Sequence, residues 1–308
     1  MDMSQEIYLF ISPHLDDVAL SCGGYARRLT SAGERVIVAT VMTADPPASE
    51  PLSWLARRNH ASWRLGDAPF GERCREDLAA IASLGAEAVQ LGLLDAIYRR
   101  DAPGQPLYTQ RSVAVPVHPY DWQFQLKAVE QRLRALLETH VGQALQVFCP
   151  LTAGGHVDHV IVRRAVENVC PTDIITYYED YPYAHQRNAV QALFTARGGF
   201  VQPARGGFVI RRPQWQATLI TLTAVEVDAR IAAVACYESQ IAGLFPSNIE
   251  RLQEILQARL PMIARYVPKS PQLTDSYRRM SVALRAYIAR VGGERYWRNS
   301  NILHDSSR

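Results

Sequence analysis

Short, continuous apolar runs alternate with segments of helical periodicity through the first 180 residues. The runs at 8–11 and 35–42 are typical of strands that are buried on both faces of a sheet. Between them, residues 17–32 carry apolar side chains at helical spacing, and Gly33 supplies a stop signal. The pattern therefore predicts a β-α-β unit at the start of the chain.

The same alternation continues to residue 179. It predicts helices over 72–84, 122–140 and 157–169, and strands at 86–93, 145–151 and 173–179. Strands that alternate with helices form parallel sheets with right-handed crossovers, and the helices cover both faces. We expect an α/β fold, a Rossmann-like three-layer sandwich with a mostly parallel twisted sheet.

Beyond residue 185 the pattern changes to short β-like pieces that glycine pairs punctuate at 198–199 and 206–207. Helical patterns follow, at about 223–242, 248–265 and 274–291. We expect a core over 1–185 and a C-terminal extension over 186–308 that packs on it as one structural unit. The helices of the extension are expected to cover the sheet or to pair subunits in a homo-oligomer.

Composition narrows the classes of function. The 33 basic and 30 acidic residues leave a formal charge of +3 without a basic block, so we expect no nucleic-acid partner. No stretch has the roughly 18 uninterrupted apolar residues of a membrane-spanning helix, and we expect a cytoplasmic protein. The five cysteines never form a C-x-x-C pair, and we interpret them as packing thiols.

Two short segments hold what a mononuclear metal hydrolase needs. Residues 13–17 read Pro-His-Leu-Asp-Asp, and residues 156–159 read His-Val-Asp-His. Each follows a predicted strand and begins a predicted helix, so both leave the same edge of a parallel sheet, where ligands bind if the strand order reverses. Their imidazole nitrogens and carboxylate oxygens suit zinc or iron. Two proline-containing connections at the same edge, 43–60 and 94–120, are expected to shape substrate binding.

In the first segment, His14 and Asp17 can bind one ion, while Asp16 points elsewhere, about 100° around the helical turn. Asp16 is then free to take a proton. The alternative is that both aspartates only cap a helix, because carboxylates there accept orphan backbone N–H groups and complement the dipole.

In the second segment, His156 and His159 lie three residues apart and share a helical face, so at least one of them can join the ion. Asp158 is suited to orient an imidazole through its second ring nitrogen. The alternative is that both histidines simply open a helix.

Together the two segments resemble the signature motifs of the LmbE-like, or PIG-L, family of zinc-dependent N-deacetylases. The resembling residues are Pro13-His14-Leu15-Asp16-Asp17, Ser21-Cys22-Gly23-Gly24, Gly155-His156-Val157-Asp158-His159, Arg73-x-x-Glu76, Leu94-Asp95, Tyr177-Tyr178-Glu179 and Tyr237-Glu238-Ser239-Gln240. The similarity covers nearly the whole chain. The sequence departs from the family's commonest wording at Leu15, Val18 and Val157, where proline, glutamate and proline are usual.

The resemblance implies a Zn²⁺ site, with Fe²⁺ as an alternative, whose ligands are His14, Asp17 and His159. It makes Asp16 the general base, His156 the general acid or oxyanion stabiliser, and Asp158 the residue that holds His156. The implied reaction is removal of an acetyl group from an N-acetylated amino sugar or its conjugate, of the N-acetylglucosaminyl type. The absence of an acidic residue at position 18 removes a charge from the rim, so substrate preference does not transfer from one member to this chain.

Three further residues are candidates for substrate contacts: Arg73, Asp95 and Tyr178. Arg73 can contact a hydroxyl or phosphate group, or it can form an ion pair with Glu76 on a solvated face. Asp95 follows the third strand and can accept sugar hydroxyls, or it can cap a turn. Tyr178 offers an aromatic face that suits a sugar ring, or it packs in the core.

Two other functions stay open. An amidase that acts on a larger sugar-thiol-type conjugate would use the same metal chemistry, and only a deacetylase would release acetate. A non-catalytic nucleotide- or sugar-binding α/β module would receive a phosphate at the first helix N-terminus. Two adjacent aspartates argue against that module because they would repel phosphate, and no G-x-G-x-x-G or Walker loop is present.

Overall fold

A seven-stranded sheet forms the centre of the computed structural model, in the order β3-β2-β1-β4-β5-β9-β8. The structure describes residues 6–65, 69–109, 113–114, 116–185, 189–190, 193, 200–204, 207–211, 215–246 and 273–299. The strands are β1 (Ile7–Ser12), β2 (Arg35–Thr40), β3 (Glu87–Gln90), β4 (Leu145–Pro150), β5 (Ile175–Tyr178), β8 (Trp215–Ile220) and β9 (Glu294–Asn299). The first five are parallel, and β9 and β8 continue the sheet in antiparallel pairing. The expected α/β fold with a mostly parallel sheet is confirmed.

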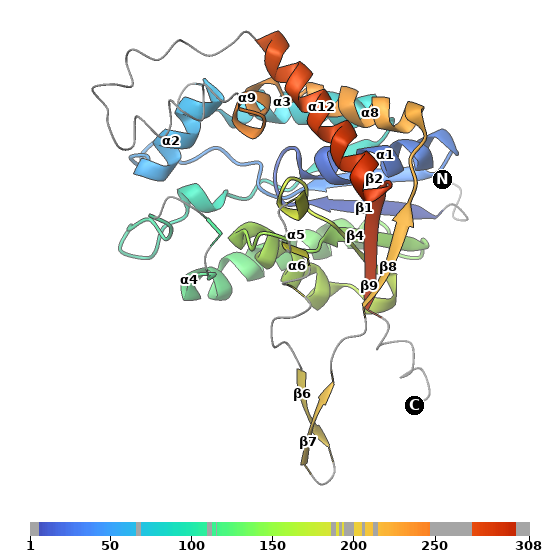
Figure 1. Cartoon of the computed structure of the whole chain (residues 1–308). Coiled ribbons are helices and arrows are strands. Elements are labelled where there is room, and N and C mark those ends of the chain that lie inside the picture. The colour runs from blue at the N-terminus through green and yellow to red at the C-terminus, as the bar shows by residue number, and fades with distance from the viewer. Residues whose placement is uncertain are drawn as a thin grey trace.

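Helices cover both faces of this sheet (Figure 1). On one side lie α1 (Asp17–Ser31), α3 (Phe70–Ser83), α8 (Ala224–Ala235), α9 (Glu238–Leu244) and α12 (Leu273–Val291), and on the other lie α5 (Gln125–Glu138) and α6 (Val157–Val169). The apolar run of β1 serves both layers, because Leu9 and Ile11 pack in the cluster of α5 and α6, whereas Phe10 packs in the cluster of α1 and α3. Alternation of side chains across a strand explains why this run has no polar positions.

The chain beyond residue 185 does more than pack on the core, because β8 and β9 form part of the main sheet. The sequence did not predict β9. The helix expected over 223–242 is divided, since α8 ends at Ala235 and α9 begins at Glu238. The helix expected over 248–265 lies outside the described residues. The strands β6 (Phe200–Ala204) and β7 (Gly207–Arg211) form a separate antiparallel hairpin that extends away from the sheet (Figure 1).

The two long connections also contain structure that the sequence pattern did not predict. Within 43–60 the helix α2 (Trp54–Trp63) begins after Ser53, whose hydroxyl accepts the N–H of Ala56 at 3.0 Å. Within 94–120 lie a 3₁₀ turn, η1 (Ala96–Tyr98), and the start of α4 (Pro119–Gln123). Further 3₁₀ turns are η2 (Thr172–Ile174) and η3 (Tyr183–His185).

Two expectations from composition can be compared with the structure. All five cysteines are free; Cys22, Cys149 and Cys170 are buried, whereas Cys74 and Cys236 are partly exposed. In the described part of the chain, no helix combines the length and the apolar character that crossing a bilayer requires.

The strand order reverses between β1 and β4. β1 pairs with β2 on one side and with β4 on the other, and all three are parallel. The chain segments that leave the carboxyl ends of β1 and β4 therefore face each other across a crevice, which is where α/β sheets bind ligands. These segments are the two candidate motifs.

Candidate active site

The turn between β1 and α1 brings His14 and Asp17 together. The backbone N–H of His14 donates to Asp17 Oδ2 at 2.9 Å, and Ser12 Oγ donates to the carbonyl of His14 at 2.7 Å. Asp16 stands at the N-cap position with φ +145°, in a region that non-glycine residues rarely adopt. Its side chain makes no capping hydrogen bond. The capping interpretation of Asp16 is therefore wrong, and its carboxylate lines the cavity described below.

The turn between β4 and α6 depends on two glycines. Gly154 and Gly155 have φ of +84° and +68°, and a Cβ on Gly154 would lie 2.6 Å from the ring of Tyr183. His156 then caps α6, because its Nδ1 accepts the N–H of Asp158 at 3.2 Å. His156 therefore both caps α6 and lines the cavity.

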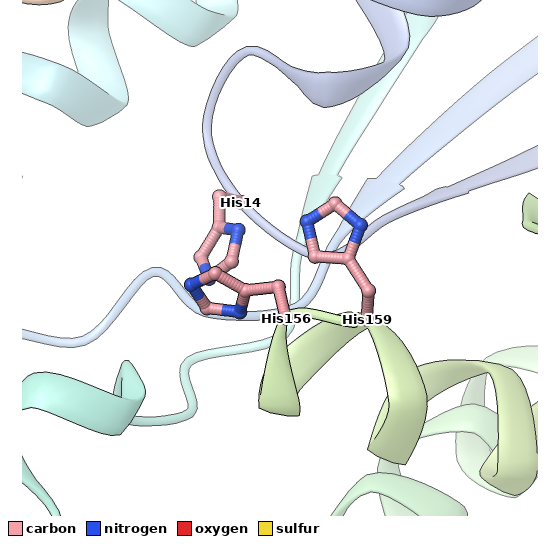
Figure 2. Close-up of side chains that lie close together, drawn as sticks. All are labelled: His14, His156 and His159. Atoms are coloured by element: carbon pink, nitrogen blue, oxygen red, sulfur yellow. The ribbon is translucent and has the colours of Figure 1, made fainter. Parts of the chain in front are cut away.

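Asp17 lies close to both of the predicted histidine ligands. Asp17 Oδ2 lies 3.3 Å from His14 Nδ1 and 3.3 Å from His159 Nε2. Ligand atoms that sit about 2.0–2.2 Å from a tetrahedral zinc ion lie about 3.3–3.5 Å from one another. The distances from Asp17 Oδ2 to the two histidine nitrogens thus match the spacing of ligand atoms around a tetrahedral zinc ion. Figure 2 shows the imidazoles of His14, His156 and His159 gathered in one place, and their nitrogens could also hold a metal ion as a group.

Carboxylates orient two of these imidazoles from behind. His159 Nδ1 lies 2.6 Å from Asp180 Oδ1, and Asp180 Oδ2 accepts the N–H of Ala153 at 3.0 Å. His14 Nε2 lies 3.1 Å from Asp158 Oδ2. A carboxylate on the second ring nitrogen is the usual support of a metal-binding histidine. Sequence reasoning missed Asp180, although its position just after β5, the neighbour of β4, was a signal that could have revealed it.

The side chain of Asp158 does not make the expected hydrogen bond to His156. Its Oδ2 lies 4.0 Å from His156 Nδ1, beyond hydrogen-bonding distance, and its nearest imidazole is His14. Its Oδ1 accepts Nη1 of Arg99 at 2.5 Å. The side chain is fully buried, so these contacts fix its direction. The structure therefore corrects the expected role, because Asp158 supports His14 and not His156.

Burial and neighbouring charges shift the pKa values of Asp16 and Asp17 in opposite directions. Burial, followed by the charge of Asp17, raises the pKa of Asp16 to about 8. Burial would also raise the pKa of Asp17, but His159 and His14 hold it well below its ordinary value. Asp17 is thus suited to be an ionised ligand, and Asp16 is suited to accept and return a proton.

The imidazoles of His14 and His156, both in the cavity wall, also have pKa values shifted in opposite directions. Burial would lower the pKa of His14, but hydrogen bonds to Asp158 and Asp17 hold it well above 6.5. Burial and the charge of His14 lower the pKa of His156 well below 6.5. His156 is therefore neutral, and because its Nδ1 accepts a backbone N–H, its proton resides on Nε2. It presents one N–H donor.

A cavity of about 830 Å³ opens above these residues. Its floor contains His14, Asp16, Asp17 and His156, whereas His159 is buried behind them and does not line it. Its outer walls come from α2, which begins in the first of the two connections expected to shape substrate binding, from α9 and from the turn that carries Tyr183. The volume is in the range of pockets that enclose small-molecule ligands.

Arg73 reaches this cavity from α3 with only 3% of its surface exposed. Its guanidinium lies over the rings of Trp63 and Phe70, 4.2 Å and 5.0 Å from their centres. Its Nε and Nη1 have no hydrogen-bond partner among the described residues. Glu76 accepts the N–H and hydroxyl of Ser239 at 2.8 Å and 2.6 Å. The alternative of a solvated Arg73–Glu76 ion pair is therefore wrong.

The two other candidates for substrate contacts lie in different surroundings. Asp95 lines the cavity, with Oδ2 3.7 Å from His14 Nε2, and it also caps η1 by accepting the N–H of Ile97 at 3.1 Å. Tyr178 is buried in the core, and its hydroxyl donates to the carbonyl of Ile11 at 2.9 Å. Because Tyr178 does not line the cavity, its expected contact with substrate is corrected to core packing.

Similarity to known proteins agrees with this geometry. Residues 9–170, more than half of the 308, match the PIG-L family, described as GlcNAc-PI de-N-acetylase. The chain is 33% identical over 201 residues to a 2'-N-acetylparomamine deacetylase of Streptomyces fradiae, over 61% of this chain and 62% of that protein. It is 27% identical over 264 residues to a 2'-N-acetylparomamine deacetylase of Niallia circulans, over 81% of this chain and 86% of the relative.

Two solved structures share the fold. A deacetylase–teicoplanin complex from teicoplanin biosynthesis has a TM-score of 0.63 at 24% identity, and the match covers 95% of this chain and 97% of that one. A zinc-inhibited form of teicoplanin deacetylase has a TM-score of 0.64 at 23% identity, covering 96% and 99%. The match to the family model, together with the site built on its two motifs, shows that the chain belongs to the PIG-L family.

Proposed function

We propose that this protein is a metal-dependent hydrolase that removes the acetyl group from an N-acetylated amino sugar conjugate. The observation that carries the proposal is the position of Asp17 Oδ2, 3.3 Å from a nitrogen of both His14 and His159 at the floor of a cavity. The names of the paromamine and teicoplanin deacetylases support the same reaction on sugar conjugates.

Zn²⁺ is the proposed metal, held by His14, Asp17 and His159, and Fe²⁺ also suits this nitrogen and oxygen donor set. When bound, such a metal lowers the pKa of water and polarises the amide carbonyl. The three ligand side chains leave room for substrate because Asp17 and His14 line the cavity.

Asp16 is the proposed general base and then the general acid. It takes a proton from water as the water oxygen forms a bond to the amide carbon, and it returns the proton to the amine as the C–N bond breaks. The products are acetate and a free amine. Its raised pKa suits both steps because neither protonation state is strongly disfavoured near neutral pH.

His156 is the proposed oxyanion stabiliser. Its neutral ring offers an Nε2–H donor from the cavity wall, and a fixed donor stabilises the negative charge that develops on the amide oxygen. We further propose that Arg73 and Asp95 contact sugar hydroxyls, because both are buried polar groups in the cavity wall.

The test is acetate release by purified, Zn²⁺-loaded protein from a series of N-acetyl sugars and N-acetyl sugar conjugates. Release of acetate that stops with a chelator and returns with metal is expected. Release of a larger acyl group without acetate would favour an amidase that acts on a larger conjugate. Failure to release acetate from any member of the series would contradict the proposed deacetylase.

A further inference from the structure

A buried network of charged side chains lies behind the candidate metal site. Arg99 is 5% exposed and stands between two carboxylates, Asp121 and Asp158, that are 1% and 0% exposed. Its Nε donates to Asp121 Oδ1 at 3.0 Å and its Nη2 to Asp121 Oδ2 at 2.7 Å, and Nη1 donates to Asp158 Oδ1 at 2.5 Å. Two guanidinium nitrogens, Nε and Nη2, thus bind Asp121, and the third, Nη1, binds Asp158.

The connection between β3 and α4 supplies most of this network. Arg99 follows η1 and donates through Nη1 to the carbonyl of Leu94 at 3.0 Å. Asp121 lies in α4 at the far end of the connection, and Tyr108 from its middle donates to Asp121 Oδ2 at 2.6 Å. Arg99 therefore links the start of this connection, at Leu94, to its end, at Asp121.

Asp158 transmits this arrangement to the site. Its Oδ1 belongs to Arg99, while its Oδ2 accepts the N–H of Ala96 at 3.0 Å and lies 3.1 Å from His14 Nε2. With Oδ1 held by Arg99, the direction of Oδ2 is set. An Nε2–H···Oδ2 hydrogen bond in turn directs His14 Nδ1 toward Asp17.

We propose that Arg99 is a positioning residue, which aims His14 at the metal by holding Asp158; this proposal rests on the proposed function. Arg99 touches none of the proposed ligands, so it acts only through Asp158. The fork is required, because lysine carries the same charge on a single nitrogen and cannot join two carboxylates in this geometry. Asp121 holds the other side of the fork.

Arg230 provides a matched control. It is also fully buried, its Nη1 donates to Glu294 Oε1 at 3.2 Å, and its Nη2 donates to the carbonyl of Leu20. Neither Arg230 nor Glu294 contacts a proposed ligand. Replacing Arg230 by lysine therefore disturbs a comparable buried ion pair without disturbing the support of His14.

The experiment uses Zn²⁺ alone as the probe. Metal-free wild-type protein, Arg99→Lys, Asp121→Asn and Arg230→Lys are titrated in competition with a chromophoric chelator, and the unfolding temperature of each metal-free protein is measured. Loss of an outer support of a metal ligand costs about 10- to 100-fold in affinity. We expect the Kd for Zn²⁺ to rise by about this factor in Arg99→Lys and in the same direction in Asp121→Asn, but not in Arg230→Lys.

The proposal is overturned if Arg99→Lys loses thermal stability like Arg230→Lys but binds Zn²⁺ as tightly as wild type. If Arg99→Lys does not fold, Asp121→Asn decides, because it keeps the shape of the side chain and its hydrogen bond from Tyr108, and an unchanged Kd there overturns the proposal. A wild-type protein that binds no Zn²⁺ would instead overturn the proposed function, which separates the two failures.

Discussion

Asp16 and Asp17 are adjacent in sequence, yet their surroundings give them opposite acid–base properties. Asp17 lies between two imidazoles that keep it ionised, whereas Asp16 is buried beside a negative charge and has a raised pKa. At the scale of single residues, this difference matches the proposed division between metal binding by Asp17 and proton transfer by Asp16. Substitutions of the two kinds of residue should give different phenotypes.

Asp16→Ala is expected to bind metal like wild type and to lose about 10²- to 10⁴-fold in turnover, the usual contribution of a general acid–base group. His159→Ala is expected to lose both metal and turnover. Metal content by elemental analysis and acetate release by a coupled assay check both. Asp173→Ala, at an exposed aspartate in η2, is the control. Loss of metal from Asp16→Ala to the extent seen in His159→Ala would show that the base assignment is wrong.

Arg73→Met is expected to raise the KM for an N-acetyl sugar without lowering the unfolding temperature. The side chain is buried with two donor nitrogens that have no hydrogen-bond partner among the described residues, and burying unsatisfied donors is destabilising. Residues that serve ligand binding commonly lower the free energy of unfolding of the protein. Thermal unfolding and steady-state kinetics on the same samples check it. A lower unfolding temperature with unchanged KM would assign Arg73 to the packing of α3.

At the scale of elements, two helices from distant parts of the chain build the outer cavity. α2 lies in the first long connection and α9 follows β8 by way of α8, and both contribute to the lining. The apolar pattern did not reveal α2, because helix formation there depends on the cap at Ser53 and on packing of Leu55 and Ala56 against η1. The divided helix over 223–242 has a similar origin, since Tyr237, between α8 and α9, is buried and donates to Asp77 Oδ1 at 2.7 Å.

Gly154→Ala tests the turn that presents His156. Alanine at φ +84° is strained, and its Cβ would meet the ring of Tyr183 at 2.6 Å. Gly33→Ala is the matched control, because Gly33 has φ +85° but its Cβ would meet nothing within 4 Å. We expect Gly154→Ala to lose about 1–3 kcal/mol more than Gly33→Ala, the usual cost of overpacking, together with turnover. Equal losses in denaturant unfolding would show that Tyr183 moves away freely.

At the scale of the whole molecule, buried carboxylates join layers that are far apart in sequence. Asp77 in α3 accepts the hydroxyl of Thr40 in β2 at 2.9 Å and the hydroxyl of Tyr237 at 2.7 Å. Burial raises the pKa of Asp77 to about 6 from its ordinary 3.8. The folded protein therefore binds this proton more tightly than the unfolded chain does, and stability must depend on pH.

Between pH 4 and 6 the folded state holds more protons at Asp77 than the unfolded state, so this group makes stability fall as pH rises through that window. Asp77→Asn removes the effect and keeps the shape of the side chain, because its amide oxygen accepts one hydroxyl and its amide nitrogen donates to the oxygen of the other. The free energy of unfolding of Asp77→Asn minus that of wild type should rise from pH 4 to 7, by on the order of 3 kcal/mol. Urea unfolding with a chelator present measures it. A difference that stays constant with pH would contradict the raised pKa.

The sequence by itself determined the alternation of strands and helices, the two motifs and their location at one edge of a parallel sheet. These features depend on local periodicity and on the handedness of crossovers, which short segments carry. Only the tertiary structure decided that Asp158 supports His14, that Asp180 supports His159, and that Tyr178 belongs to the core. Those roles depend on side-chain directions between segments far apart in the chain, and no local pattern encodes such directions.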